Sequence, residues 1–506
     1  MRELLLRIDH GSLIKNMRWV FLLLAFTSLA RSAPDRRGPL IVRASDVEQQ
    51  LINRFTDEGD IASYEELKSI VGELDESFID FRHYDYNQLT AKLKNISEEF
   101  PSMTSMYTAG RSVDGRELWV LVVSKTPKEH TKGVPEFKYI ANMHGNEVSG
   151  RVFLVYLAEL LLRNYETNEY IRRLVDTTRI HLMPSMNPDG YEKSTEGDDS
   201  GIRGRMNKNH YDLNRNFPPR FRDTKAAQPT QPETAAAMKW IRSLPFVLSA
   251  NLHGGTAIVN YPFDDSSMGR RNRRASSYSP APDNELFVRL AYTYARAHKN
   301  MWKPGPRCRD SWLNYEQDPR LGIVNGAEWY VVSGGMQDWN YVHTNCMELT
   351  VEINCVKFPP RRELKNLWEE NKYALLHYID QTHNAIHGFI TDARTGAPIE
   401  NATISIDTKS KIVTSFAHGE FWRLVNLGNY SITIDHPDYI PNNFTVEITL
   451  SKRSHRLDAS LLRLGDALPA RKPDGAIKGE PDGASSNSPL ASAIIVAVTI
   501  LLRITM

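Results

Sequence analysis

The sequence predicts an α/β domain with a mostly parallel mixed sheet flanked by helices, followed by a small all-β sandwich. The first observation is that apolar runs typical of buried strands, such as 118–123 and 137–141, alternate with segments of helical apolar spacing. The second is that the pattern changes after Asn384, where short β-patterned runs are separated by turns. These observations predict the α/β domain at 81–384 and the sandwich at 385–465.

The α/β domain is expected to open with a helix. Residues Tyr86 to Phe100 have helical spacing, and Pro101 ends the helix because proline cannot continue it. A buried strand at 118–123 and the run into His144 come next, and residues 151–165 are expected to form a helix that covers the sheet. Further strands are expected within 180–191, 246–255 and 346–355.

Charge balance and cysteine count limit the class of protein. The 506 residues carry 62 Lys and Arg against 61 Asp and Glu, so no overall field favours nucleic acid as a partner. The three cysteines, Cys308, Cys346 and Cys355, allow at most one intrachain disulfide. Because Cys346 and Cys355 flank one short strand, their mutual pairing is geometrically poor, and we expect Cys308 to bond to one of them. The sequence does not decide which one.

Both ends of the chain have the pattern of processing signals. Residues 1–33 include a basic-then-apolar order from Met17 to Phe26 that is typical of a secretory signal peptide. Residues 34–80 form a polar, partly helical segment without recognisable chemistry. After a flexible stalk at 466–489, the apolar tail at 490–506 is short for a membrane span of about 20 residues. We therefore expect a glycolipid (GPI) anchor signal, with a short single span or a secreted form as the alternatives.

Export agrees with the N-glycosylation sequons that begin at Asn95, Asn401, Asn429 and Asn443. A basic run at 270–274 predicts a solvated loop, and its dibasic pattern also raises the hypothesis of cleavage into a two-chain form. The expected location is the extracellular face of the plasma membrane.

A metal site is predicted at the ends of two strands. In His144-Gly145-Asn146-Glu147 an imidazole and a carboxylate stand three positions apart, and zinc accepts both as ligands. This spacing alone is weak, because it occurs by chance on solvated surfaces. A second apolar run ends at His253 in the same way. Since ligand sites of α/β folds form at the carboxyl edge of the sheet, His144, Glu147 and His253 are predicted to bind one zinc ion.

Polar residues farther along the chain have the chemistry to bind a carboxylate. Arg205 and the Asn214-Arg215 pair lie in predicted loops, where the default for each is a solvated side chain. Planar guanidinium groups, however, bind carboxylates bidentately and stabilise a developing oxyanion. In a later strand, alternation places Glu348 and Glu352 on one face, where a buried glutamate must be neutralised, liganded or catalytic.

Together these motifs closely resemble the zinc metallocarboxypeptidases, in particular the regulatory branch that includes carboxypeptidases E, N, D and M. The resemblance covers roughly Phe81 to Asn384, and it is specific because several separated motifs occur in the family order. It implies His144, Glu147 and His253 as the zinc ligands of an exopeptidase. For 385–465 it implies the transthyretin-like β-sandwich that follows the catalytic domain in this branch.

The resemblance also implies a role for each remaining site residue. Arg215 with Asn214 resembles the clamp for the terminal carboxylate of the substrate, and Arg205 resembles the donor that faces the scissile carbonyl oxygen. Tyr330 resembles the mobile tyrosine that closes on the peptide. Glu352 resembles the general acid/base.

Two of these assignments are choices between neighbouring residues. Tyr341 follows Tyr330 along the chain, and Glu348 shares the strand face of Glu352. The alignment of Gly334-Gly335 and of the Asp-Trp pair after it with the family favours Tyr330 and Glu352.

Substrate preference is expected to depend on Asp264. In the branch that cleaves basic residues, the matching aspartate pairs with the side chain of the last residue, and Gln337 stands at a pocket position that differs between preferences. The resemblance thus implies removal of C-terminal Arg or Lys from peptides and proteins, with metal-activated water as the nucleophile. Two alternatives stay open: an inactive peptide-binding homologue and a zinc deacylase that acts on small N-acyl amino acids.

Overall fold

The computed structural model describes residues 44–221, 228–267, 277–303, 308, 321–407 and 410–466. Several predicted segments lie outside these residues: the signal peptide region, the basic run at 270–274, the stalk from 467 onward and the apolar tail. Among the described helices, none combines the length and the apolar composition that a membrane crossing requires.

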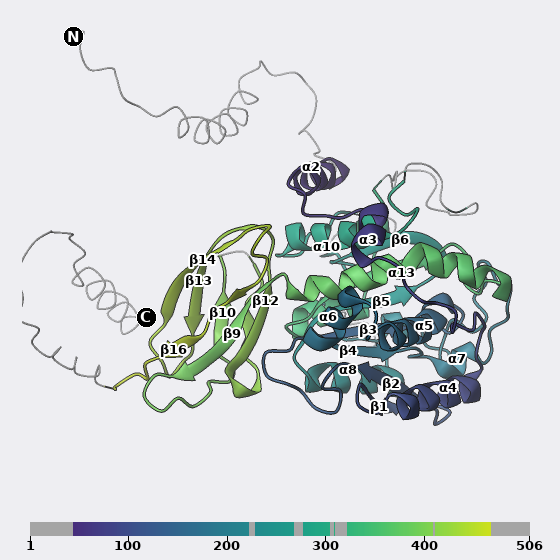
Figure 1. Ribbon diagram of the computed structural model, residues 1–506, viewed down its shortest axis with the longest axis horizontal. Coiled ribbons are helices and arrows are strands. Elements are labelled where there is room, and N and C mark those ends of the chain that lie inside the picture. Colours follow the sequence, from purple (N-terminus) through teal and green to yellow (C-terminus); the bar gives the residue numbers. More distant parts are fainter. Residues whose placement is uncertain are drawn as a thin grey trace, which may run out of the picture. The chain divides into compact units, whose positions relative to one another are not determined.

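The α/β domain is built on an eight-stranded mixed sheet in the order β1-β2-β4-β3-β5-β8-β6-β7 (Figure 1). Its strands are β1 (Thr104–Arg111), β2 (Glu117–Val123), β3 (Glu136–Ala141), β4 (Arg179–Met183), β5 (Phe246–His253), β6 (Thr256–Tyr261), β7 (Ile323–Asn325) and β8 (Met347–Asn354). β4, β3, β5 and β8 run parallel, whereas the pairs β1/β2, β2/β4 and β6/β8 are antiparallel. The predicted fold class is confirmed, and every residue of β3, β5 and β8 is buried, as expected where helices cover a parallel sheet.

Helices pack against this sheet and against one another. Those of the α/β domain are α4 (Tyr86–Glu99), α5 (Ser149–Arg163), α6 (Glu169–Thr177), α7 (Pro188–Tyr191), α8 (Pro232–Ser243), α10 (Asn284–Ala297), α11 (Gly326–Trp329), α12 (Met336–His343) and α13 (Leu364–Asp380). α4 begins at Tyr86 and ends before Pro101, as predicted. α5 ends at Arg163 rather than at Tyr165, with Asn164 as its C-cap. The side-chain amide of Asn164 donates to the carbonyls of Leu160 and Asp75, and its oxygen accepts from the N–H of Asp75.

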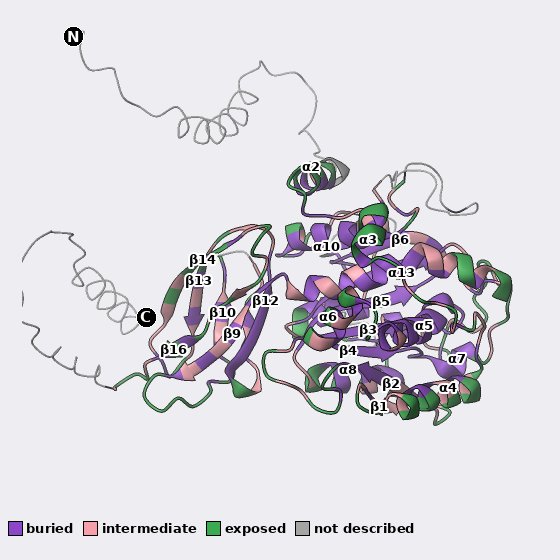
Figure 2. Cartoon of the chain, viewed as in Figure 1, coloured by how far each residue is buried: buried purple, intermediate pink, exposed green. Residues whose placement is uncertain are grey.

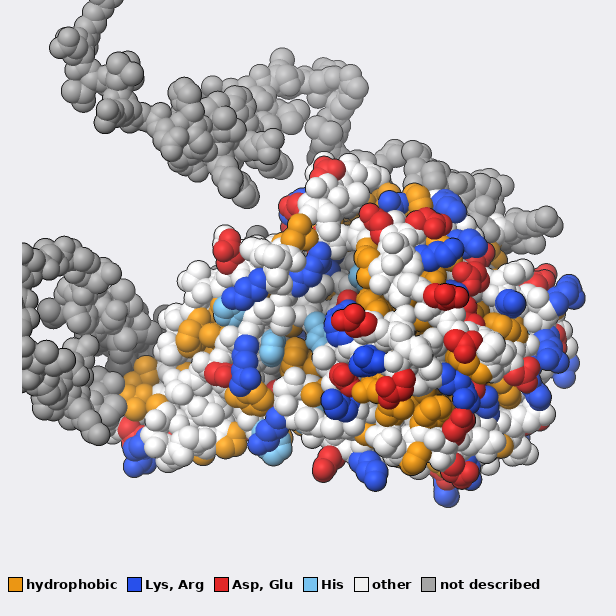
Figure 3. All heavy atoms as spheres, in the orientation of Figure 1, with side chains coloured by type: hydrophobic (Ala, Val, Ile, Leu, Met, Phe, Trp, Pro, Cys, Tyr) orange, Lys and Arg blue, Asp and Glu red, His pale blue; other side chains and the backbone are white. Residues whose placement is uncertain are grey.

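Burial follows this layering. Figure 2 shows buried residues gathered in the sheet and in α5, and exposed residues on the outer sides of helices such as α4. Figure 3 shows acidic and basic side chains interspersed over the face in view, in keeping with the nearly equal numbers of the two kinds in the sequence.

Two helices precede residue 81, where the predicted α/β domain begins. α2 (Ala44–Asp57) packs against α10, and α3 (Tyr64–Val71) packs against α13. α3 starts with a capping box, in which Ser63 and Glu66 satisfy each other's backbone N–H groups. Both helices therefore form part of the folded α/β domain.

The C-terminal part is an all-β sandwich with a core of its own. One sheet has the order β11-β10-β13-β14, the other has the order β12-β9-β15, and β16 also pairs with β9. The strands are β9 (Ala385–Asp392), β10 (Thr403–Ser405), β11 (Val413–Thr414), β12 (Glu420–Leu424), β13 (Gly428–Asp435), β14 (Asn442–Ile448), β15 (His455–Arg456) and β16 (Ala459–Leu461). His130 joins the sandwich to the α/β domain, because its ring lies 2.7 Å from Glu136 Oε1 and 2.9 Å from Glu420 Oε2.

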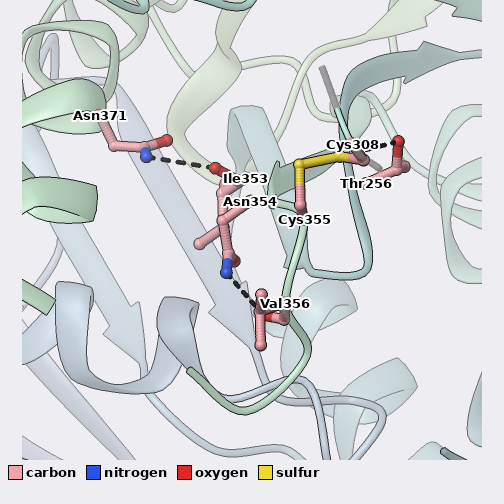
Figure 4. The surroundings of a disulfide bond; sticks show 7 residues. All are labelled: Thr256, Cys308, Ile353, Asn354, Cys355, Val356 and Asn371. Atoms are coloured by element: carbon pink, nitrogen blue, oxygen red, sulfur yellow. Dashed lines mark hydrogen bonds between the residues drawn. A yellow bond between two sulfur atoms is a disulfide. The ribbon is translucent and has the colours of Figure 1, made fainter. Parts of the chain in front are cut away.

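The cysteine pairing that the sequence left undecided is Cys308 with Cys355. Figure 4 shows this disulfide at the end of β8, where Asn371 donates a 3.2 Å hydrogen bond to the carbonyl of Ile353. Cys346, at the other end of the strand, is buried and forms no disulfide. The bond therefore ties Cys308 to the end of the strand that carries Glu352.

Candidate active site

The three predicted metal ligands converge at one edge of the sheet. β3 and β5 are parallel neighbours with Ala141 paired to Leu252, so the loop after β3 and the last residue of β5 emerge side by side. Glu147 Oε2 lies 2.9 Å from His144 Nδ1 and 2.7 Å from His253 Nδ1. One ligand atom from each residue lies within 4.8 Å of the others. Two imidazole nitrogens and one carboxylate form the donor set that zinc takes in open catalytic sites.

Hydrogen bonds from Asn142 hold the ligand loop in shape. Asn142 has a positive φ of 56°, and its side-chain amide donates to the carbonyls of His144, Gly145 and Glu147 at 3.0, 2.9 and 3.2 Å. A Cβ atom at Gly145 would lie 2.3 Å from the backbone of Gly190, so only glycine fits there. Asn142 and Gly145 therefore allow the turn to bring His144 and Glu147 together.

Asp212 is a site residue that the sequence analysis missed. Its Oδ1 lies 3.0 Å from His144 Nε2, so Nδ1 of the same ring points toward Glu147. Burial would raise the pKa of Asp212, but His144, Arg205 and Arg215 outweigh burial and hold that pKa far below its usual range. Its position in the same short motif as Asn214 and Arg215 was the available signal.

The carboxyl group of Glu147 is held in its ionised form. Burial raises its pKa, yet the charges and hydrogen bonds of His144 and His253 outweigh burial and place the pKa well below the usual range. His253 Nε2 lies 2.7 Å from the side-chain amide of Asn251, which fixes the orientation of this second ring. An anionic carboxylate between two oriented imidazoles suits a divalent cation.

Arg205 lies directly beside the metal-ligand group. Its Nη1 donates to Glu147 Oε1 at 3.1 Å, and its Nε and Nη2 donate to Asp212 Oδ2 at 3.1 and 3.0 Å. These carboxylates fix the guanidinium plane, which leaves a preorganised cation next to the site where an oxyanion would form.

Asn214 and Arg215 follow Asp212 in a short 3₁₀ helix, Leu213–Arg215. The side-chain oxygen of Asn214 accepts from the backbone N–H of Met336 at 3.0 Å, which links this loop to the start of α12. Arg215 Nη1 donates to the carbonyl of Asn214 at 2.8 Å. The clamp pair predicted from the sequence is therefore anchored to the element that also carries Gln337.

Tyr330 lies within electrostatic range of the other predicted residues. Burial raises the pKa of Tyr330 to about 12, with Arg215 and Arg205 opposing the rise and Glu352 and Asp264 adding to it. The neighbouring Tyr341 instead donates to Asp283 Oδ2 at 2.8 Å. The structure thus brings Tyr330, and not Tyr341, near Arg205 and Arg215.

Glu352 lies on β8 in register with His253 of β5. Its Oε2 atom is buried and has no hydrogen-bond partner among the described residues. Burial and the charge of Glu147 raise the pKa of Glu352 well above its usual range, against Arg205 and Lys357. A buried carboxyl group with a raised pKa beside a metal-ligand group has the properties of a proton carrier.

Glu348 shares the strand face of Glu352, as predicted, but its environment is different. Its Oε2 accepts from Ser249 Oγ at 2.6 Å and from Asn340 Nδ2 at 2.8 Å, and it lies 3.7 Å from Lys138 Nζ. All of these groups are buried. Glu348 is therefore the neutralised glutamate of the two.

The two predicted pocket residues, distant in sequence, contact each other. Gln337 Nε2 donates to Asp264 Oδ1 and to Asn260 Oδ1, both at 3.1 Å. Asp264 is 2 % exposed, and Gln337 Oε1 is buried without a hydrogen-bond partner in the described part of the chain. Asn260 is a second residue that the sequence analysis missed, since nothing but this contact marks it. The group brings a carboxyl and amide acceptors together at a buried position.

Comparison with known proteins agrees with this site. The profile of the zinc carboxypeptidase family matches residues 89–374, and that of the carboxypeptidase regulatory-like domain matches 385–462. Mouse carboxypeptidase M is 40% identical over 413 residues, which cover 81% of this chain and 88% of that protein. The chain belongs to the zinc carboxypeptidases. The group of His144, Glu147 and His253 fits the zinc ion of this family.

Other known proteins are similar over shorter shares of their length. Carboxypeptidase D of Anas platyrhynchos is 49% identical over 370 residues, which cover 73% of this chain and 26% of that protein, so the chain spans about a quarter of it. Carboxypeptidase Z of Rattus norvegicus is 40% identical over 438 residues, which cover 79% of this chain and 66% of that protein. A crystal structure of thrombin-activatable fibrinolysis inhibitor matches with a TM-score of 0.46 at 16% identity, over 67% of this chain and 85% of that chain.

Proposed function

We propose that this metallocarboxypeptidase removes C-terminal arginine or lysine from peptides and proteins. The observation that carries the proposal is the buried Asp264–Gln337 pair, which lies within electrostatic range of Arg215. A carboxylate in a buried pocket is costly unless a cation pairs with it. The guanidinium or ammonium group of a basic last residue supplies that cation.

Each site residue then has a defined task. Arg215 and Asn214 bind the terminal carboxylate, which limits cleavage to the end of a chain. When bound, zinc polarises the scissile carbonyl and lowers the pKa of a water molecule. Glu352 takes a proton from the attacking water and returns it to the leaving amine, while Arg205 donates to the carbonyl oxygen as negative charge develops there. Tyr330 closes over the bound peptide.

This function is tested by comparing the hydrolysis of two substrates: a blocked dipeptide that ends in Arg with a free carboxylate, and the same dipeptide with a C-terminal amide. We expect turnover of the free acid and none of the amide, because the amide lacks the carboxylate that Arg215 binds. The zinc chelator 1,10-phenanthroline should abolish turnover, and added zinc should restore it. Zinc-loaded protein without turnover would favour the inactive homologue. Turnover of small N-acyl amino acids alone would favour the deacylase.

The pocket carboxyl gives the proposal a pH dependence. Burial raises the pKa of Asp264 to about 7, and the negative charges of Asp265 and Glu348 contribute to this increase. Protonated Asp264 has no charge for a cationic side chain, so affinity for Arg-terminated peptides should increase as the pH rises through about 7. The ratio of kcat/KM for Arg- over Ala-terminated peptide removes the titration of groups common to both reactions. It should rise severalfold between about pH 6 and pH 8; a flat ratio contradicts the assignment.

The proposal includes an extracellular location with a GPI anchor. The sequon residues Asn95, Asn401, Asn429 and Asn443 are all exposed, which supports N-glycosylation during export. Peptide N-glycosidase F should therefore reduce the apparent mass of the expressed protein. Phosphatidylinositol-specific phospholipase C should release it from cells, and retention after this treatment would contradict the anchor.

A further inference from the structure

Helix α2 lies outside the region that matches the zinc carboxypeptidase profile, yet it is fixed to the catalytic domain. It spans Ala44–Asp57, whereas the profile match starts at residue 89. Its apolar face of Leu51, Ile52 and Phe55 is 9, 2 and 1 % exposed, and the helix packs on α10. Arg54 Nη2 also forms a 2.9 Å ion pair with Glu285 Oε2 of α10. The catalytic domain thus includes an additional helix that packs at a defined position on α10.

One polar side chain of α2 reaches the strand that leads into the specificity pocket. Glu48 is 6 % exposed, and its Oε1 accepts a hydrogen bond from the hydroxyl of Tyr261, which is fully buried. Burial raises the pKa of Glu48 to about 7, against the hydrogen bond from Tyr261. A buried carboxyl group is costly without a partner, so this contact has a structural consequence at Tyr261.

Tyr261 is the last residue of β6, and the pocket begins beside it. Successive side chains of a strand point to opposite faces, so Asn260 faces Gln337 while Tyr261 faces Glu48. The chain then continues through Pro262, whose carbonyl accepts from Asn325 Nδ2 at 3.1 Å, to Asp264. Through Glu48, α2 therefore contacts the strand that leads to Asp264 on the face opposite to Gln337.

Asp338 holds the same turn from the other side. Its two carboxylate oxygens accept from the backbone N–H groups of Asp264 and Asp265 at 2.8 and 2.9 Å. Backbone hydrogen bonds also hold the segment that carries Asp264, from the N–H of Ala327 to the carbonyl of Phe263 and from the N–H of Val332 to the carbonyl of Asp264. Glu48 adds a contact at the strand before this segment. Loss of the Glu48 contact allows β6, and with it the carboxyl, to shift relative to Arg215.

We propose that Glu48 is a positioning residue of the specificity pocket, which acts through Tyr261 on the placement of Asp264. The inference rests on the proposed function, since it takes Asp264 as the partner of a basic substrate side chain. A charge-assisted hydrogen bond depends steeply on distance, so a small shift of β6 weakens the binding of arginine more than that of alanine. The zinc edge is carried by β3, β5 and β8, and β8 pairs with β6, so kcat and KM are measured separately to distinguish an effect on the chemistry from an effect on substrate binding.

The test compares Glu48→Ala and Tyr261→Phe, each of which removes the same hydrogen bond. For an Arg-terminated peptide we expect KM to rise at least about fivefold, with kcat within about twofold of wild type. For an Ala-terminated peptide both constants should stay near wild type. Glu48→Gln should retain the selectivity, because the amide oxygen still accepts from the tyrosine. The double variant should lose no more than either single one.

Arg54→Ala is the matched control, since it removes an α2 ion pair that does not reach β6. It should leave the ratio of kcat/KM for Arg- over Ala-terminated peptide unchanged. An unchanged ratio in Tyr261→Phe, or an equal loss on both peptides, would overturn the inference, and this variant suffices if Glu48→Ala fails to fold. Wild-type enzyme without preference for a basic last residue would instead refute the proposed function, a result obtained before any variant is made.

Discussion

Replacing Glu352 with glutamine is expected to lower kcat on an Arg-terminated peptide by about 10³-fold or more, because general acid–base catalysis contributes about 10²–10⁴-fold. Glutamine keeps the shape of the side chain and cannot carry the proton between water and leaving amine. The zinc content should stay at that of wild type, because Glu352 is outside the ligand group of His144, Glu147 and His253. Steady-state kinetics and metal analysis of the same preparation measure both effects.

Glu348→Gln is the matched control for this variant. Glu348 lies on the same face of β8, and its carboxylate is bound by Ser249, Asn340 and Lys138. Its replacement weakens a buried charge pair and should therefore lower the melting temperature while kcat stays within a fewfold of wild type. Substantial activity in Glu352→Gln would remove Glu352 from the mechanism.

The second large effect is expected at Asp264. Asp264→Asn should lower kcat/KM for an Arg-terminated peptide about 10- to 100-fold, because a hydrogen bond between charged groups is worth about 1.5–3 kcal/mol. An Ala-terminated peptide, which has no cation for the pocket, should be cleaved at nearly the wild-type rate. The ratio of the two kcat/KM values measures the contribution of the pocket carboxyl.

Folding is not expected to explain that loss. Burial raises the pKa of Asp264 from 3.8 to about 7, so the folded state disfavours the ionised form and stability falls as the pH rises between these values. Asparagine has no such cost, and the melting temperature of Asp264→Asn at neutral pH should not decrease. Asp265→Asn, one residue farther along the same turn, is the control and should keep the preference for arginine. An unchanged preference in Asp264→Asn would contradict the pocket assignment.

The residues that the sequence indicated are those whose chemistry is tied to a local pattern. An apolar run that ends in His-Gly marks a strand end, and a glutamate three positions later made His144 and Glu147 a candidate ligand pair. The metal site was predicted because a second apolar run ends in His-Gly at His253. The alternation in β8 likewise predicted that Glu348 and Glu352 share a face, although only the contacts of Glu348 showed which of the two is neutralised.

What the sequence did not indicate depends on contacts between distant segments. Asp212 orients His144 across 68 positions, and Gln337 meets Asn260 across 77 positions, so no spacing rule reveals either contact. The pairing of Cys308 with Cys355 joins residues 47 positions apart, so the sequence did not distinguish Cys355 from Cys346 as the partner. The role inferred for Glu48 depends on a helix without recognisable motif and on a contact 213 residues away.

The preference for a basic last residue is the property on which the proposed function depends most. Its most direct test measures kcat/KM of the zinc-loaded enzyme on blocked dipeptides that end in Arg, Lys or Phe and share the same preceding residue. We expect kcat/KM for the Arg- or Lys-terminated dipeptide to exceed that for the Phe-terminated one by at least about tenfold, because an apolar ring leaves the buried carboxyl unpaired. Faster turnover of the Phe-terminated peptide would contradict it.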